Sequence, residues 1–83
     1  MERVFQKELK LSAQKVWFES QKIFVQCSDG RIVGNPLTWF PRLANATESQ
    51  LNDFEIFGNG TGIHWNELDE DLSINGFVYF SPY

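Results

Sequence analysis

One stretch near the C-terminal end of the chain gathers residue types that can do chemistry. Positions 62–72, GIHWNELDEDL, contain the only histidine, His64, and four acidic side chains. Imidazole nitrogen and carboxylate oxygen are common ligands of divalent metals, and a metal-bound water can hydrolyse a substrate. The stretch is therefore a candidate metal-assisted hydrolytic or ligand-binding site, with His64, Glu67, Asp69 and Asp71 as its candidate residues.

The same acids also have a structural explanation, which we favour. One histidine without a second histidine or paired cysteines is a thin ligand set, and LDED lacks the spacing of a calcium loop. Asp69 is expected instead to cap a short helix that ends at Gly76, because acids in a first turn complement the helix dipole. Ile63 is expected to face the core, so that His64 points the other way, toward a carboxylate, in a hydrogen-bonding role.

The single cysteine, Cys27, offers little chemistry. It lies on the apolar face of an expected strand with no base beside it, which is typical of a small buried hydrophobic residue rather than a nucleophile. It cannot pair within the chain, and the N-terminal residues contain no apolar leader. We therefore expect a cytoplasmic protein. No cofactor is expected.

Aromatic residues and one arginine are the candidate partner-binding residues. In WFPRL, Arg42 can stack on Trp39 or reach a carboxylate of the LDED segment, and we favour that structural role. Alternatively, Trp39 and Arg42 are exposed anchors for a protein partner. The tail, expected as a terminal strand over 77–83, has apolar residues on both faces. Its side chains Tyr79, Phe80 and Tyr83 are therefore candidates for a partner contact or a homodimer.

The order of elements predicts an α+β domain. Residues 15–20, 22–30 and 31–33 read as a three-stranded meander, with a type I′ turn at Asp29-Gly30 and an end at Gly34-Asn35-Pro36. Thr47 and Gln50 form a capping box that begins a short helix. Residues 54–65 read as strand, glycine-rich turn and strand, and the helix from Asp69 follows. The chain is expected to be a single domain, 1–83, with a core over 13–77 and peripheral segments 1–14 and 78–83.

The charge balance excludes some classes of partner. Eleven acidic residues against seven basic ones give a net charge of -4 and a pI of about 4.8. Nucleic acids and anionic membranes are bound by basic surfaces, so neither is an expected partner. An acidic body suits a basic protein partner or serves solubility.

The blocks SDGR, PLTWFPRLANAT and GIHWNELDEDLSINGF resemble a bacterial family, domain of unknown function 2442, over about 13–77. The resemblance implies a small curled antiparallel sheet, a three-stranded meander plus one or two further strands, with two short helices. The family has no established activity, but its members often lie beside another small uncharacterised family, 4160, in a toxin–antitoxin-like arrangement. The chain departs from the family at Gly34-Asn35 and in its more aromatic tail.

These observations favour a non-enzymatic protein-interaction domain, antitoxin-like or regulatory. The product of a neighbouring small gene is the expected partner, and a homodimer is the other arrangement considered. The metal-assisted or ligand-binding site around His64 is the alternative.

Overall fold

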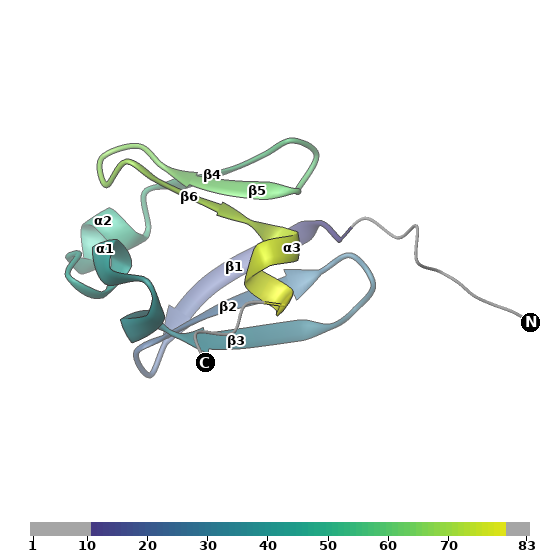
Figure 1. Ribbon diagram of the computed structural model, residues 1–83, viewed down its shortest axis with the longest axis horizontal. Helices are drawn as coiled ribbons and strands as arrows, with labels where there is room; N and C mark the ends of the chain where they lie inside the picture. The colour runs from purple at the N-terminus through teal and green to yellow at the C-terminus, as the bar shows by residue number, and fades with distance from the viewer. Residues whose placement is uncertain (1–10, 80–83) are drawn as a thin grey trace, which may run out of the picture.

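The computed structural model describes residues 11–79, which form two facing three-stranded antiparallel sheets (Figure 1). The first sheet has the order β1-β2-β3, and the second the order β4-β5-β6. The strands are β1 (Ala13–Glu19), β2 (Lys22–Cys27), β3 (Ile32–Pro36), β4 (Phe54–Phe57), β5 (Gly62–Trp65) and β6 (Glu70–Ser73). The helices are the 3₁₀ turn η1 (Leu37–Trp39), α1 (Pro41–Ala44), α2 (Glu48–Leu51) and α3 (Ile74–Tyr79). The α+β prediction is confirmed, with a second three-stranded sheet where one or two strands were expected.

The turns of the first sheet differ from expectation in type. Gly30 has φ +94°, and its N–H donates to the carbonyl oxygen of Cys27 at 2.9 Å. Positive φ at Gly30 is as predicted, but Asp29 has no positive φ, so the turn is not type I′. The type I′ backbone belongs instead to the β1–β2 turn, where Ser20 and Gln21 have φ 53° and 63°. Serine and glutamine are not residue types that predict a type I′ turn from the sequence.

Strand β3 continues through Pro36, beyond the expected end at Val33. Proline is tolerated there because β3 lies at the edge of its sheet. Gly34 lies opposite Phe24, whose ring occupies the place of a Cβ: one built on Gly34 would come within 2.5 Å of the ring. Asn35 is buried and its side-chain amide donates to the carbonyl oxygen of Phe77 at 3.0 Å. Gly34 and Asn35, where the chain departs from the family pattern, therefore both have structural roles.

The final helix begins later in the chain than the sequence predicted. Residues 70–73 form β6, and Asp69 lies in the preceding turn with φ 53°. Helix α3 begins at Ile74 and is capped by Ser73, whose hydroxyl accepts from the N–H of Gly76 at 3.2 Å. Gly76 is therefore inside the helix rather than at its end. The expected terminal strand is also wrong at 77–79, which belong to α3, and its remaining residues lie outside those described.

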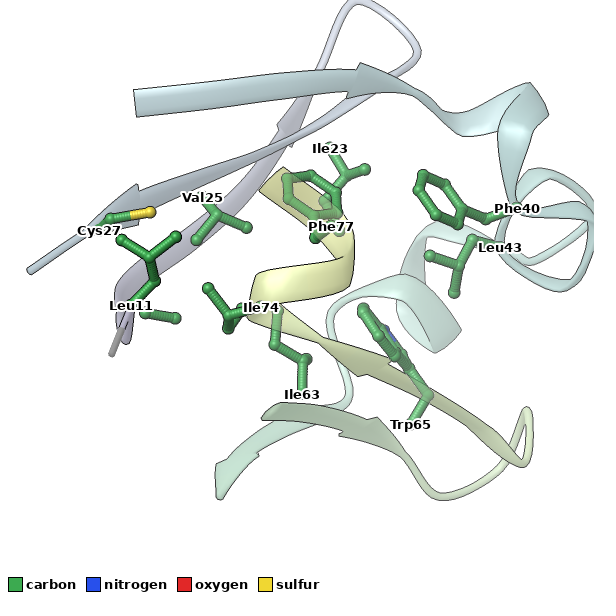
Figure 2. Packing of buried hydrophobic residues seen from close by; sticks show 11 residues of the cluster. Leu11, Ile23, Val25, Cys27, Phe40, Leu43, Ile63, Trp65, Ile74 and Phe77 are labelled. Atoms are coloured by element: carbon green, nitrogen blue, oxygen red, sulfur yellow. The ribbon is translucent and has the colours of Figure 1, made fainter. Parts of the chain in front are cut away.

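The core lies between the sheets (Figure 2). Trp65 is fully buried, and its indole N–H donates to the carbonyl oxygen of Leu51 at 2.9 Å. The capping box of α2 is confirmed: Thr47 and Gln50 exchange hydrogen bonds at 2.9 and 3.1 Å. Side chains from both sheets, α1 and α3 converge on this core, namely Ile23, Val25, Cys27, Leu43, Ile63, Trp65, Ile74 and Phe77.

The two sheets are joined along both sides. On one side, the Phe18 and Phe54 rings meet edge to face at 6.2 Å, which links β1 to β4. On the other side, α3 covers the space between the sheets, and the Phe77 ring stacks on Phe40 at 5.9 Å. Strand β6 is an outer strand of the second sheet and lies beside η1 and α3. No helix within residues 11–79 is long and apolar enough to cross a membrane.

Candidate functional site

His64 lies on the outer face of the second sheet. Its neighbours Ile63 and Trp65 are fully buried, so the alternation of a strand directs the imidazole outward. Glu55 of β4 and Asp71 of β6 are its cross-strand partners. The Nδ1 atom of His64 is hydrogen-bonded to Asp71 Oδ1, as expected of a histidine facing a carboxylate.

The surroundings of His64 favour its charged form. The hydrogen bond to Asp71 raises the pKa of His64 above its ordinary value, and the contact with Asn66 acts in the same direction. The Nε2 atom lies 3.2 Å from Asn66 Oδ1, so both ring nitrogens face oxygen acceptors. A doubly protonated ring satisfies both contacts, but it has no lone pair with which to bind a metal or accept a proton.

The other residues of the candidate metal site make different contacts. The Glu67 carboxylate accepts from the side-chain amide of Gln50 at 3.2 Å. Asp69 lies beside Arg42, whose Nη1 donates to the Asp69 carbonyl oxygen at 2.6 Å. Of the four candidates, the structure therefore brings together His64 and Asp71. Within residues 11–79, no group of three or more His, Cys, Asp or Glu side chains is arranged to hold a metal.

Two potential nucleophiles, Ser73 and Cys27, have structural roles. The Ser73 hydroxyl caps α3. Cys27 is fully buried, and this burial, with the negative charge of Asp29, raises the pKa of the thiol. A protonated buried thiol is a weak nucleophile. Cys27 is thus the small core residue that its strand position predicted.

A groove of about 290 Å³ lies between the η1–α1 segment and β6. Trp39 and Phe40 line one side, Glu70–Ser73 line the other, and Gly76 and Phe77 of α3 complete the lining. Side chains alternate along β6, so Glu70 and Leu72 share the groove side with their buried partners Trp65 and Ile63, whereas the Asp71 carboxylate lies on the outer face beside His64. We call this feature the β6 groove. It combines an apolar lining with the acidic side chain of Glu70 at the edge of a sheet.

Some backbone N–H and C=O groups of β6 point away from β5, toward the open edge of the sheet. The N–H of Ile74 donates to the carbonyl oxygen of Thr61 at 2.9 Å, so this pair is of the hydrogen-bonded type. Because hydrogen-bonded and non-hydrogen-bonded pairs alternate along antiparallel strands, the backbone groups of Leu72 and Glu70 also bond to β5. The N–H and C=O of Asp71 and the N–H of Ser73 consequently project away from β5.

The candidate partner-binding residues are spread over two areas. Trp39 lines the β6 groove, and Arg42 follows three residues later in the sequence, in α1. Tyr79 is 70% exposed at the end of α3, where its hydroxyl bonds the Arg31 guanidinium and raises the pKa of that arginine. Phe80 and Tyr83 lie outside the described residues.

Sequence reasoning missed Leu72 and Gly76 as parts of a site. They were assigned to a helix and to its end, and the groove exists because 70–73 form an edge strand instead. The strand could have been recognised from the alternation of outward and inward residues after His64. That alternation is short, its polar positions are acidic, and the same residues match a helix pattern equally well.

The chain matches a family model over residues 13–83, that of the protein of unknown function DUF2442. It belongs to that family. The resemblance found from the WFPRL and GIHWNELDEDLS blocks is therefore confirmed. The family's description carries no activity.

Two solved structures are similar to this DUF2442 domain. A protein of unknown function from Rhodospirillum rubrum is 33% identical, with a TM-score of 0.72, and the match covers 82% of this chain and 84% of the other. An uncharacterised protein from Chromobacterium violaceum, solved by NMR, is 25% identical with a TM-score of 0.67. That match covers 80% of this chain and 62% of the other. No curated protein matches the chain significantly.

Proposed function

We propose that this DUF2442 domain is a non-enzymatic protein-interaction domain, antitoxin-like or regulatory, whose contact surface is the β6 groove. One observation carries the proposal: an apolar groove runs along the open edge of β6, where Asp71 and Ser73 project backbone groups. Proteins often bind an extended segment of a partner at such an edge, with main-chain bonds for affinity and a neighbouring pocket for a side chain.

The surroundings of His64 support an interaction role over catalysis. Its raised pKa and its two oxygen partners favour the protonated imidazole, a form that neither binds a metal nor accepts a proton. The hydroxyl of Ser73 and the thiol of Cys27 serve the helix cap and the core. Both of these reactive groups therefore have structural uses.

A co-expression experiment tests the proposal. The domain is produced together with the product of the adjacent small gene, and complex formation is measured by size-exclusion chromatography. The decisive variant is Gly76→Leu, because Gly76 lines the β6 groove and a side chain there occupies it. We expect the complex to form with the unaltered domain and to be lost with Gly76→Leu.

The matched control is Gly76→Ala, which adds a single methyl group at the same position. A Cβ on Gly76 meets Ser73 at 3.7 Å, an ordinary contact, so neither variant disturbs the fold through this atom. The complex should survive Gly76→Ala. If the complex forms equally well with Gly76→Leu, the groove is not the contact surface and the proposal is wrong.

A further inference from the structure

We infer that the β6 groove receives an arginine side chain from an extended peptide segment that adds as a fourth strand beside β6. The inference rests on the proposed protein-interaction function and names the chemistry of the partner. Three features carry it: the direction of the backbone groups of β6, the Glu70 carboxylate on the groove side, and the aromatic side chains opposite it.

The backbone of β6 is suited to one incoming strand. Hydrogen bonding toward β5 uses the main-chain groups of Glu70 and Leu72, so those of Asp71 face the edge. The projecting N–H and C=O of Asp71 and the N–H of Ser73 offer up to three main-chain bonds to an extended segment. A small molecule would match these backbone groups less well than a peptide backbone does.

The charge of the groove selects a cationic partner. Glu70 lies on the groove side of β6, opposite Trp65, whereas the Asp71 carboxylate faces His64 on the outer side. Glu70 forms no ion pair within residues 11–79, so its charge is available to a cationic side chain. A second copy of the chain, pairing β6 with itself, would bring these carboxylates against one another. Like charges in opposed strands are destabilising, so a basic segment fits better than a homodimer.

The lining of the groove favours arginine over lysine. The half-buried side chains of Leu72 and Trp39 present apolar surface along which an aliphatic stem can lie, over the buried rings of Phe40 and Phe77. A guanidinium is planar and weakly hydrated, and two of its donors can fork onto the Glu70 carboxylate while its face rests on an aromatic ring. An ammonium group loses more hydration in the same place.

Synthetic peptides test the inference on the full chain. The probe is acetyl-Thr-Val-Arg-Val-Thr-amide, whose β-branched residues favour an extended backbone. Citrulline in place of arginine removes the charge and keeps the shape. Binding is followed by NMR, from the amide shifts of Asp71 and Ser73. We expect the arginine peptide to bind about tenfold more tightly than the citrulline peptide, a difference of about 1.4 kcal/mol.

Substitutions in the domain provide the matching half of the test. The variant Glu70→Gln should weaken the arginine peptide about tenfold and leave the citrulline peptide nearly unchanged. The control is Asp53→Asn, an exposed acid that does not line the groove. N-methylation at successive peptide residues tests strand addition: alternate positions should abolish binding, since alternate N–H groups face β6.

Three results would overturn the inference. They are equal binding of the arginine and citrulline peptides, shifts that map outside the β6 groove, and equal tolerance of N-methylation at every position. The proposed function fails separately. If the neighbouring gene product is lost with Gly76→Leu but retained with Glu70→Gln, protein interaction stands and the arginine inference is wrong.

Discussion

Arg42 of α1 donates from Nη1 to the main-chain carbonyl oxygen of Asp69 at 2.6 Å, which ties the helical connection to the β5–β6 turn. The Asp69 carboxylate is farther away, with Oδ2 at 3.9 Å from the same nitrogen. The expected link between the WFPRL and LDED segments therefore exists. Its main partner is a backbone oxygen rather than a side-chain carboxylate.

Arg42→Met should lower the free energy of unfolding by about 0.5–1 kcal/mol. Methionine keeps an apolar stem and loses the hydrogen-bond donor. The expected loss of stability is small because the Arg42 side chain is 59% exposed. Urea denaturation measures the change. Asp69→Asn is the control, because it keeps the carbonyl oxygen and should cost at most a few tenths of a kcal/mol. An equal loss in both variants would make the carboxylate the partner that matters.

Asp69 has φ 53°, a backbone conformation that glycine adopts without strain and aspartate adopts at some cost. Asp69→Gly should therefore leave stability unchanged or raise it by up to about 0.5 kcal/mol, and Asp69→Val should lower it by about 1 kcal/mol or more. Thermal unfolding of the two variants measures the difference. A loss of stability in Asp69→Gly would show that the aspartate side chain, not the backbone conformation, determines the preference.

Local signals in the sequence predicted much of the first sheet and the central turn of the fold. The capping box of Thr47 and Gln50, positive φ at Gly30, burial of Cys27 and the outward direction of His64 each depend on neighbours within a few residues. Such features follow from side-chain alternation and short-range hydrogen bonds. They needed no knowledge of distant contacts.

Strand β6 could not be predicted in the same way. Leu68 and Leu72 are four residues apart, and acids lie between them, so the segment matches the start of an amphipathic helix. Pairing with β5, which places Leu72 opposite Ile63, decides the outcome. The β6 groove depends on that non-local pairing, so it was missed together with the strand.

Gly76→Ala should raise the free energy of unfolding by about 0.5–1 kcal/mol. Gly76 lies inside α3, its φ is not positive, and a Cβ meets only Ser73 atoms at 3.7 Å. Alanine therefore gains helix propensity and loses unfolded-state entropy without a clash. Chemical denaturation gives the value. A loss of about 1 kcal/mol, as expected of a glycine with left-handed conformation, would mean that α3 ends at Gly76 after all.

The stability of the domain should depend on pH through His64. Its pKa is raised in the folded protein, first by the hydrogen bond to Asp71 and then by that to Asn66. A raised pKa means that the folded state holds the proton more tightly than the unfolded state. The resulting stabilisation is complete below the ordinary histidine pKa of about 6.5 and is lost as the pH rises through the folded pKa.

The single histidine of the chain makes this dependence measurable by NMR, since its ring resonances need no assignment among others. Titration should give a pKa above 6.5 for the unaltered protein and a lower value for Asp71→Asn. Glu55→Gln should lower the pKa less, because Glu55 acts only through its charge. Thermal midpoints of the unaltered protein and Asp71→Asn should differ most at low pH and converge above the folded pKa. If Asp71→Asn leaves the pKa of His64 unchanged, the hydrogen bond between the two side chains does not govern its titration.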